Sequence, residues 1–475
     1  MSDPLPPQSV IRSKVRRIAV TFFDRGYLKQ LLKLAVPIML QGFVTASLNM
    51  VGLLMIGQKG DVAVAAVGLA GQLFFLLNLV VFGIASGSAI FTAQLWGKKD
   101  IPNIHKVLGL SLLMAVLASA AFFILAEVFP SQVLAVYTQD PAVIALGSRY
   151  LQIYGFSFLF FAITVSYSTI LRSIGNVRLP LTVSALALSF NTLLAYALIF
   201  GKLGLPAMGV TGAAIAAVAA RFVECAGILA VTYLTKSPVA AKLKELLAIE
   251  LKFAGKVLKP VLPVALNEFL WAMGITTYNA IYARIGTGSI AAMNIISTIE
   301  NLAFVVFTGI CLATAVMVGH HIGGGEEKRA FSDAGRSLGL GAASGLLLGG
   351  MALLGGDKIL TLYKVSPAVL ADAHRVLTIF GLLLWLRAMN SILVVGILRG
   401  GGDTRFSLFL DGFIIWIVGV PLAALGAFVF HFPVYWVYLL AMSEEIIKWC
   451  LGLLRFFSRK WIHNLTHTLP DTTRT

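Results

Sequence analysis

Residues 259–285 read KPVLPVALNEFLWAMGITTYNAIYARI and place a single acidic residue, Glu268, inside a long apolar run. A helix of about 20 apolar residues crosses a bilayer, so this run is long enough to do so. Carboxylates inside membrane helices are costly, and those that occur usually face a protein interior or a water-filled path. The stretch therefore predicts a membrane-spanning helix that carries a functional acid near the middle of the bilayer.

The same stretch opens the second copy of an internal repeat. Residues 226 or 227 positions apart match, and the pairs include Pro37 with Pro263, Gly83 with Gly309, Gly155 with Gly381 and Arg172 with Arg399. An even number of helices in each copy lets both copies enter the membrane from the same side, as parallel repeats do. Transporters built in this way bind substrate between two halves that move against each other.

The composition excludes an ordinary soluble protein, because 58% of the residues are hydrophobic, 12% are charged and the mean hydropathy is +0.89. Apolar segments long enough to cross a bilayer occur at about residues 34–57, 63–94, 107–129, 150–171, 179–200, 209–233, 259–285, 289–319, 334–355, 376–398, 406–428 and 434–457. We therefore predict an all-α polytopic membrane protein with twelve transmembrane helices in two parallel pseudo-symmetric six-helix bundles.

The basic residues set the orientation, because short loops rich in Lys and Arg stay on the cytoplasmic side. Most of the 37 Lys and Arg residues fall in cytoplasmic segments when the N-terminus is placed inside. Both termini are then cytoplasmic, in a multi-pass protein of the plasma (inner) membrane. The predicted organisation is a basic cytoplasmic N-terminal segment (1–33), an N-lobe (34–233), a cytoplasmic amphipathic linker (234–258), a C-lobe (259–457) and a cytoplasmic tail (458–475).

The net charge of +16 does not indicate a nucleic-acid-binding protein, because the basic residues lie in loops between apolar segments. We expect no nucleic-acid partner, and a monomer embedded in the lipid bilayer. Residues 320–325 read HHIGGG, without further His or carboxylate residues at metal-ligand spacing. The glycine triplets also lack the Lys and Ser/Thr of a phosphate loop. The sequence therefore predicts neither an enzyme nor an ATP-driven pump, and no cofactor.

Ionisable residues inside the predicted helices are concentrated in the second half of the chain. They are Glu268, Glu300, Arg387, Asp411, Glu444, Glu445 and Lys448. In the first half only Arg221 and Glu224 are clearly embedded, and the helix at 34–57 contains no acidic residue. This asymmetry predicts a cation site in the C-lobe, and we expect Glu268, Glu300 and Asp411 to provide it.

At about 100° per residue, Glu268 shares a helical face with Trp271, Asn279 and Tyr282. A carboxylate, an amide and aromatic rings along one line suit both a cation and an apolar compound. The predicted substrate cleft or buried polar network therefore comprises Asn267, Trp271, Asn279, Tyr282, Arg387, Asn390 and Glu445.

A structural role remains an alternative for each of these charges. Glu268 could simply bond to a neighbouring helix, and Arg387 could form an ion pair with a glutamate that fixes helix packing. Glu300 and Asp411 suit ion transfer and helix anchoring equally well. The spacing of Glu444 and Lys448 favours a structural ion pair.

Six short motifs resemble those of the multidrug and toxic compound extrusion (MATE) family of secondary transporters. They are residues 34–37 (LAVP), 94–97 (QLWG), 171–176 (LRSIGN), 267–268 (NE), 319–323 (GHHIG) and 398–405 (LRGGGDTR). The resemblance covers about residues 28–457. It implies export of cationic or amphipathic organic compounds through a cleft between two lobes, in exchange for Na⁺ or H⁺.

The resemblance also implies a role for Glu268, which matches the glutamate that binds the coupling cation in members with a second-lobe site. Na⁺ at Glu268 is one form that this site could take. The sequence departs from the family pattern at two places, so the resemblance does not decide whether Na⁺ or H⁺ is the coupling ion. The helix at 34–57 lacks the aspartate of some branches, and residues 387–391 (RAMNS) lack the acid of the sodium-coupled branch.

Two other functions are compatible with parts of the pattern. A flippase for lipids or lipid-linked oligosaccharides of the same superfamily would have a cationic central cavity and additional helices. A membrane-embedded enzyme or receptor is disfavoured because the sequence shows no catalytic cluster and has a two-lobe repeat.

Overall fold

The computed structural model describes residues 24–361, 363 and 365–469. The first half of the chain forms α2 (Arg25–Gly57), α3 (Asp61–Lys98), α4 (Ile101–Val128), α5 (Pro130–Ala135), α6 (Pro141–Gly155), α7 (Ser157–Ser173), α8 (Arg178–Phe200) and α9 (Gly209–Leu234). Most of the predicted N-terminal segment and the last residues of the predicted tail lie outside the described residues.

The second half repeats this order after the short helix α10 (Leu243–Leu247). It forms α11 (Leu251–Ile285), α12 (Thr287–Gly323), α13 (Glu327–Leu360), α14 (Pro367–Ser391) with η1 (Ile392–Arg399), then α15 (Thr404–Ser407), η2 (Leu408–Phe413), η3 (Ile415–Gly419), α16 (Val420–Ala424) and η4 (Leu425–Val429), and finally α17 (Val434–Phe457) and η5 (Leu465–Thr468). Each segment that was predicted to cross the membrane is helical.

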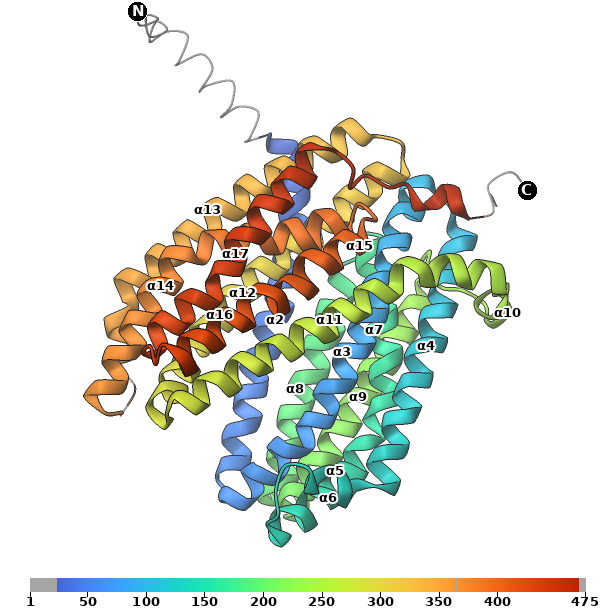
Figure 1. Ribbon diagram of the computed structural model, residues 1–475. Helices are drawn as coiled ribbons and strands as arrows, with labels where there is room; N and C mark the ends of the chain where they lie inside the picture. The colour runs from blue at the N-terminus through green and yellow to red at the C-terminus, as the bar shows by residue number, and fades with distance from the viewer. Residues whose placement is uncertain (1–23, 362, 364, 470–475) are drawn as a thin grey trace, which may run out of the picture.

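Nine helices among the described residues are long and apolar enough to cross a membrane, and the bent pair α6–α7 makes a tenth. The two remaining long helices are α11 and α17, which run through the same bundle (Figure 1). Their hydropathy is reduced because they carry charged residues such as Glu268, Glu444 and Lys448. With α11 and α17 the described chain makes twelve helical passages.

Matching caps begin equivalent helices of the two halves. Asp140 accepts a hydrogen bond from the Ala142 amide at the start of α6, and Ser366 accepts one from the Val369 amide at the start of α14. A proline follows each cap, where its fixed φ suits the first helical position. The two halves therefore share the capping residues at the starts of equivalent helices as well as the pattern of apolar segments.

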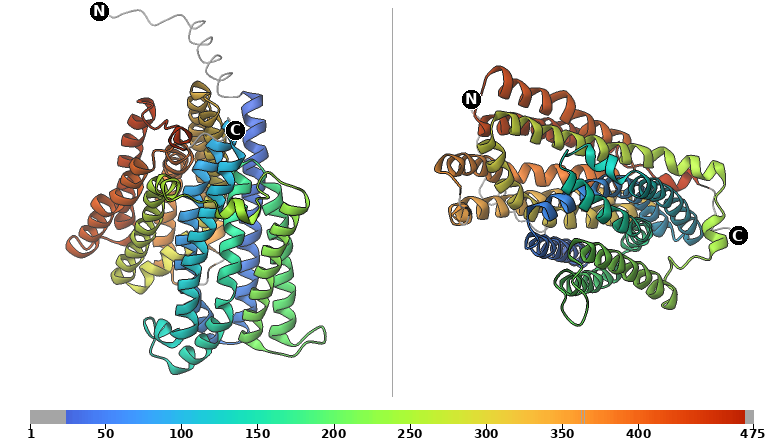
Figure 2. Two further views of the ribbon diagram at one scale, coloured as in Figure 1. Left: turned by 90° about the vertical axis from the view of Figure 1, so that its right-hand side faces the viewer. Right: turned by 90° about the horizontal axis from the view of Figure 1, so that it is seen from below.

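Figure 1 shows α3–α9 as one bundle and α13, α14, α16 and α17 as another. The bundles meet beside the two described ends of the chain, a region that we call the terminal end, and diverge toward α5 and α6. Figure 2 shows the same separation from the side and from below. One buried cluster joins them, because Leu31, Leu34 and Ala35 of α2 pack with residues of α12 and α13.

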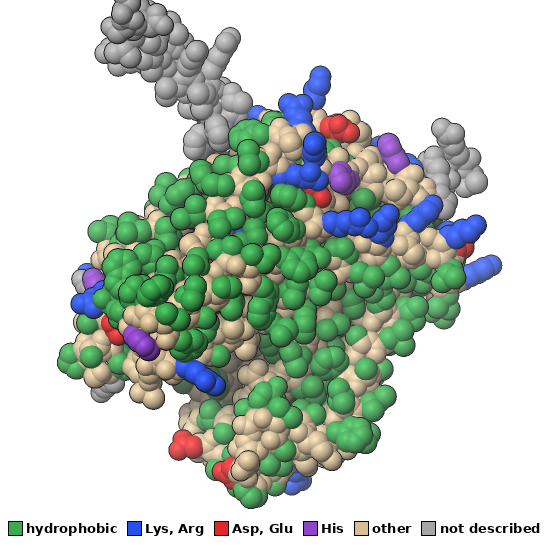
Figure 3. Space-filling model, in the orientation of Figure 1, with side chains coloured by type: hydrophobic (Ala, Val, Ile, Leu, Met, Phe, Trp, Pro, Cys, Tyr) green, Lys and Arg blue, Asp and Glu red, His purple; other side chains and the backbone are tan. Residues whose placement is uncertain are grey.

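The surface of both bundles is largely apolar (Figure 3). Several leucines have between 64% and 70% of their residue surface exposed, which would be unfavourable in water; they include Leu186, Leu193, Leu347 and Leu454. Lys and Arg side chains gather instead at the terminal end (Figure 3). These observations are consistent with helices that face lipid and with a basic rim at the membrane surface.

The structure departs from the sequence prediction at two places. Helix α2 begins at Arg25, because Asp24 caps it by accepting a hydrogen bond from the Gly26 amide. In the predicted connection between the halves, Leu243–Leu247 forms the short helix α10, and residues 251–258 already belong to the first turns of α11. The amphipathic pattern of this connection thus continues into a membrane helix.

Candidate functional site

A cavity of about 210 Å³ lies on the side of the second bundle that faces the first half of the chain. Its lining includes Phe82 of α3 together with polar side chains of α11, α14, η1, η2 and α17. The charged residues that line it are Glu268, Arg387, Arg399, Asp411, Glu445 and Lys448. The cavity therefore collects most of the ionisable residues that the sequence placed inside the membrane.

Glu268 is bound by an arginine that lies 131 residues further along the chain. Arg399 Nη1 donates to Glu268 Oε1 at 2.5 Å, and Arg399 Nη2 lies 3.8 Å from Asp411 Oδ2. The Arg399 side chain is 3% exposed, so this guanidinium is held almost entirely by protein groups. Asn267 Nδ2 also donates to Asp411 Oδ2, at 3.0 Å.

Lys448 extends this group of charges toward α17. Its Nζ donates to Asp411 Oδ1 at 3.4 Å and to Glu444 Oε1 at 3.3 Å. Both Lys448 and Glu444 are almost fully buried. The ion pair predicted from their spacing is confirmed, and it forms part of a larger network. We call Glu268, Arg399, Asp411, Glu444 and Lys448 the arginine–lysine cluster.

A second cluster lies on α12, α14 and α17. Arg387 forms an ion pair with Glu300, and its Nε lies 3.9 Å from Glu445 Oε1. Asn390 Nδ2 donates to both the backbone carbonyl and Oε2 of Glu445, each at 2.7 Å. The predicted pairing of Arg387 with an acid is confirmed.

The charges of these two clusters do not balance. Five carboxylates, those of Glu268, Glu300, Asp411, Glu444 and Glu445, face three cations, those of Arg387, Arg399 and Lys448. Buried charges are normally compensated because an unpaired ion in a low-dielectric interior is very costly. An excess of two negative charges therefore favours the uptake of cations or protons at this site.

The structure places the three remaining predicted site residues in three different environments. Trp271 lines the cavity beside Glu268. Asn279 is exposed and Tyr282 is buried in the core of the second bundle, so neither lines this cavity. Both share the helical face of Glu268, but Asn279 lies about 17 Å further along a helix with a rise of 1.5 Å per residue.

The expected site residues did not include Arg399 and Lys448, which organise the site; Lys448 was predicted only as the partner of Glu444 in a structural ion pair. Arg399 ends a π-helical segment, and Asp411 lies in another, and such segments often occur at functional sites. The sequence signal for Arg399 was present, because the Ile-Leu-Arg triplet occurs at the end of equivalent helices in both halves. Its partner was not visible, since Glu268 is 131 residues away.

The two bundles make their closest approach at the terminal end. A Cβ atom on Gly97 of α3 would collide with the His320 carbonyl of α12, and one on Gly323 would collide with the Gln94 carbonyl. His320 Nε2 also lies 2.6 Å from the Ser173 carbonyl oxygen, which links α12 to α7. No side chain larger than hydrogen fits at these two glycines, so the bundles are sealed together here.

The C-terminal tail crosses this seal. The Gln94 side chain donates to the His463 carbonyl at 3.1 Å and accepts from the Leu465 amide at 2.8 Å. Asn464 Nδ2 donates to the Ile322 carbonyl, and the indole of Trp461 is fully buried. The tail thus connects α3 of the first half to α12 of the second.

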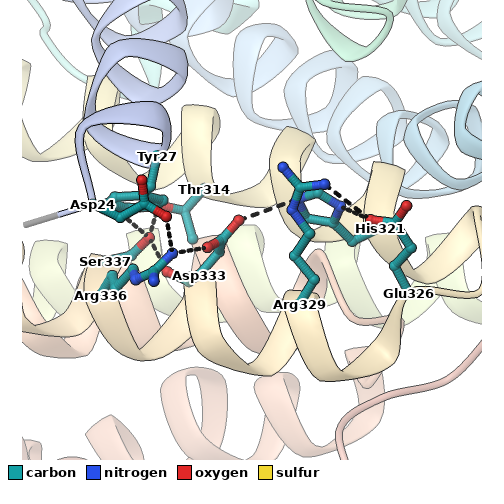
Figure 4. Close-up of polar contacts among 9 residues, drawn as sticks. All are labelled: Asp24, Tyr27, Thr314, His321, Glu326, Arg329, Asp333, Arg336 and Ser337. Atoms are coloured by element: carbon teal, nitrogen blue, oxygen red, sulfur yellow. Dashed lines mark hydrogen bonds and ion pairs between the residues drawn. The ribbon is translucent and has the colours of Figure 1, made fainter. Parts of the chain in front are cut away.

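A polar network also joins α2 to the second bundle at the terminal end (Figure 4). Arg336 Nη1 lies 3.2 Å from Asp24 and 2.9 Å from Asp333, while Tyr27 Oη is 2.7 Å from Ser337 Oγ. His321 lies between Glu326 and Asp333, with 3.1 Å from a ring nitrogen to each carboxylate. The Gly26 amide and the Arg336 guanidinium hold the pKa of Asp24 below its usual range.

Comparison with known proteins places the chain in a family. Residues 37–197 and 263–425 each match the sequence pattern named MatE, and the two matches begin 226 residues apart, as the repeat does. Probable multidrug resistance protein NorM of Thermotoga maritima is 25% identical over 440 residues, covering 91% of this chain and 93% of the relative. Multidrug resistance protein PmpM of Pseudomonas aeruginosa is 26% identical over 407 residues, covering 84% and 83%.

Solved structures share the fold. A mutant of the Vibrio cholerae MATE transporter VcmN superposes with a TM-score of 0.85 at 18% identity, over 93% of this chain and 99% of that chain. A MOP superfamily transporter from Pyrococcus furiosus superposes with a TM-score of 0.81 at 18% identity, over 91% and 96%. The predicted all-α fold of twelve transmembrane helices is confirmed. The two matches to the family pattern cover more than half of the sequence, and the chain therefore belongs to the MatE family of membrane transporters.

Proposed function

We propose that this protein exports cationic or amphipathic organic compounds in exchange for a proton that enters the cell. The observation that carries the proposal is the excess of carboxylates over cations in the two charge clusters beside the cavity of the second bundle. The charges that line the cavity balance, and Glu300 and Glu444 behind them supply the excess. Relatives named as multidrug resistance proteins support it. We propose the plasma membrane as its location and the monomer as the active form.

A proton suits this site better than Na⁺. One oxygen of Glu268 is already bound by Arg399, and the carboxylate of Asp411 is shared by Asn267, Arg399 and Lys448. Hard metal cations require several oxygen ligands at once, whereas a proton requires a single carboxylate oxygen. Among the residues that the structure describes, no group of three or more His, Cys, Asp or Glu side chains is arranged to hold a metal.

The exchange follows from competition for the same charges. A cationic compound in the cavity compensates the carboxylate excess, and protonation removes that excess. Each ligand therefore weakens binding of the other, and this coupling must be reciprocal. If the basic terminal end is cytoplasmic, the sealed end faces the cell interior, and protons would reach the carboxylates from outside and release the compound there.

Proteoliposomes with separately imposed proton and Na⁺ gradients test this proposal. The cationic dye rhodamine B ethyl ester should accumulate on the more acidic side of the membrane, because the proton leaves that side as the dye enters. A Na⁺ gradient at equal pH on both sides should cause no accumulation. Accumulation with Na⁺ alone would contradict proton coupling, and none with either ion would contradict the exporter function.

Variants of the second cluster locate the coupling site. Glu300→Gln and Glu445→Gln each remove one negative charge next to Arg387, so proton-driven accumulation should fall at least about tenfold, corresponding to about 1.4 kcal/mol. Glu327→Gln removes an exposed acid at the start of α13 and provides the matched control. Unchanged accumulation in all three variants would exclude the second cluster from coupling.

A further inference from the structure

A second polar cavity, of about 220 Å³, lies within the first bundle. The ionisable residues in its lining are Arg172, Arg221 and Glu224. Arg221 Nη1 donates to Glu224 Oε2 at 2.8 Å, and Ser184 Oγ donates to Glu224 Oε1 at 2.6 Å. Glu224 is thus compensated by Arg221, and the cavity keeps one excess positive charge.

Arg172 carries that excess. Its Nε is buried without a hydrogen-bond partner, and no carboxylate among the described residues forms an ion pair with it. Glu224, which lines the same cavity, is bound by Arg221 and Ser184. Arg172 is partly buried, and a guanidinium that has lost part of its water without gaining an anion is energetically costly. Arg172 lies in the last turn of α7, where a cation also interacts favourably with the helix dipole, but this interaction leaves the side-chain donors unused.

The repeat explains why this arginine lacks a partner. Arg172 is equivalent to Arg399, whose carboxylate partners are Glu268 and Asp411. The positions equivalent to those two acids are Gly42 and Ser184. The neutral part of the network is preserved, since Gln41 donates to Ser184 at 2.9 Å much as Asn267 donates to Asp411. The first bundle has therefore kept the cation of the shared design and lost both acids.

The cavities of the two bundles adjoin each other. A smaller cavity between them is lined by both Arg172 and Arg399, and Phe82 lines this cavity and the two larger ones. A molecule in the smaller cavity meets the guanidinium groups of Arg172 and Arg399, and in the adjoining cavity of the second bundle it meets the carboxylates of Glu268, Asp411 and Glu445. Apolar residues such as Leu312 and Val395 cover the middle.

We propose that Arg172 is the anion-binding subsite for transported compounds, so that the preferred substrates are amphipathic zwitterions with a carboxylate or phosphate group as well as a cationic group. The anionic group binds the Arg172 guanidinium, which is suited to bidentate recognition of such groups. The cationic group binds the carboxylates of the second bundle. This inference rests on the proposed export function and specifies its substrate class.

Two dyes that differ in one group test the subsite. Rhodamine B is a zwitterion with a free carboxylate, and its ethyl ester is the corresponding cation with the same chromophore. Binding to the purified protein is measured by fluorescence polarisation. Arg172→Gln should bind rhodamine B about 10- to 100-fold more weakly, the loss expected for one charged hydrogen-bonded contact. Its affinity for the ester should not change.

Further variants separate charge from structure. Arg172→Lys keeps the charge and should keep a preference for rhodamine B over the ester that Arg172→Gln loses. Ser184→Asp supplies an acid at the position equivalent to Asp411 and should also remove the preference, with Arg172 still present. Arg178→Gln, at the exposed start of α8, is the matched control and should bind both dyes like the original protein.

The outcomes distinguish this inference from the export function. Equal binding of both dyes by the original protein and by Arg172→Gln would overturn the anion subsite and leave cation export intact. A parallel loss of both dyes in Arg172→Gln and Arg172→Lys would make Arg172 a structural residue, which also overturns the subsite. Failure of the original protein to bind or transport either dye would instead contradict the export function.

Discussion

Glu268 and Arg399 show how two buried charges depend on each other at the scale of single residues. Their side chains are 13% and 3% exposed and meet at 2.5 Å, so water compensates little of either charge. Removal of one partner of a buried pair leaves the other uncompensated, whereas removal of both can be nearly neutral. Single and double substitutions of this pair can therefore separate its contribution to the free energy of unfolding from its contribution to transport.

We predict that Arg399→Gln lowers the free energy of unfolding by about 3 kcal/mol, because Glu268 and Asp411 lose their shared cation. The double variant Glu268→Gln/Arg399→Gln should recover more than half of that loss. Unfolding of the purified protein by SDS in mild detergent measures both values. Arg405→Gln, at an exposed position nearby, is the control. Strictly additive effects of the two substitutions would show that the pair is not energetically coupled.

The sequence predicted this site in part. The depth of Glu268 and the excess of acids in the second half follow from hydropathy and from counting charges. The pairing could not follow, because Arg399 reads as an arginine at the cytoplasmic end of a helix, where positive residues are common. Only the folded helices bring it back to Glu268.

At the scale of elements, the C-terminal tail contributes more than its length suggests. Trp461 is fully buried, and its indole donates to the Phe456 carbonyl at 3.0 Å. Its ring stacks on Phe456 and covers the glycines that follow η1, where Gly401 leaves room for it. The tail therefore completes the core of the second bundle at the terminal end.

Trp461→Ala should lower the free energy of unfolding by about 3 kcal/mol, the lower end of the loss seen when a buried aromatic side chain is truncated. The same SDS titration measures it. His467→Ala changes an exposed residue of the same tail and should have no measurable effect. A Trp461→Ala protein as stable as the original would show that the tail only lies on the surface.

The elements themselves were largely predictable. Apolar length predicted the membrane-spanning segments, but the helices that begin at Pro141 and Pro367 start nine residues before the predicted segments 150–171 and 376–398. The π-helical segments around Arg399 and Asp411 were not predictable, because their hydrophobic pattern does not differ from that of an α-helix. The tail was missed for another reason, since a polar segment after the last apolar helix usually lies in water.

At the scale of the whole molecule, the two bundles differ in charge across a shared cavity. The repeat accounts for both the likeness and the difference, because Arg172 and Arg399 are equivalent but, within the described part of the chain, Arg399 alone of the two forms ion pairs with acids. Two equivalent halves can move against each other about their common axis. Because the bundles are sealed together at the terminal end, this structure represents the arrangement in which the two halves are closed at that end.

A disulfide across that seal should stop transport without preventing binding. A Cβ atom on Gly319 would lie 2.6 Å from the Ala93 Cβ, so Ala93→Cys and Gly319→Cys bring two thiols together after a displacement of about 1 Å, given the usual Cβ separation of a disulfide. Cys225, Cys311 and Cys450 are first replaced by serine or alanine. The oxidised protein should bind rhodamine B ethyl ester normally, because neither Ala93 nor Gly319 lines the cavity of the second bundle. It should not accumulate the dye in proteoliposomes until dithiothreitol is added, since the bundles must separate at this end for the cavity to face the cytoplasm.

Each single cysteine variant is the control for the substitutions themselves. Full transport by the oxidised double variant would mean that the terminal end is not the gate that opens during exchange.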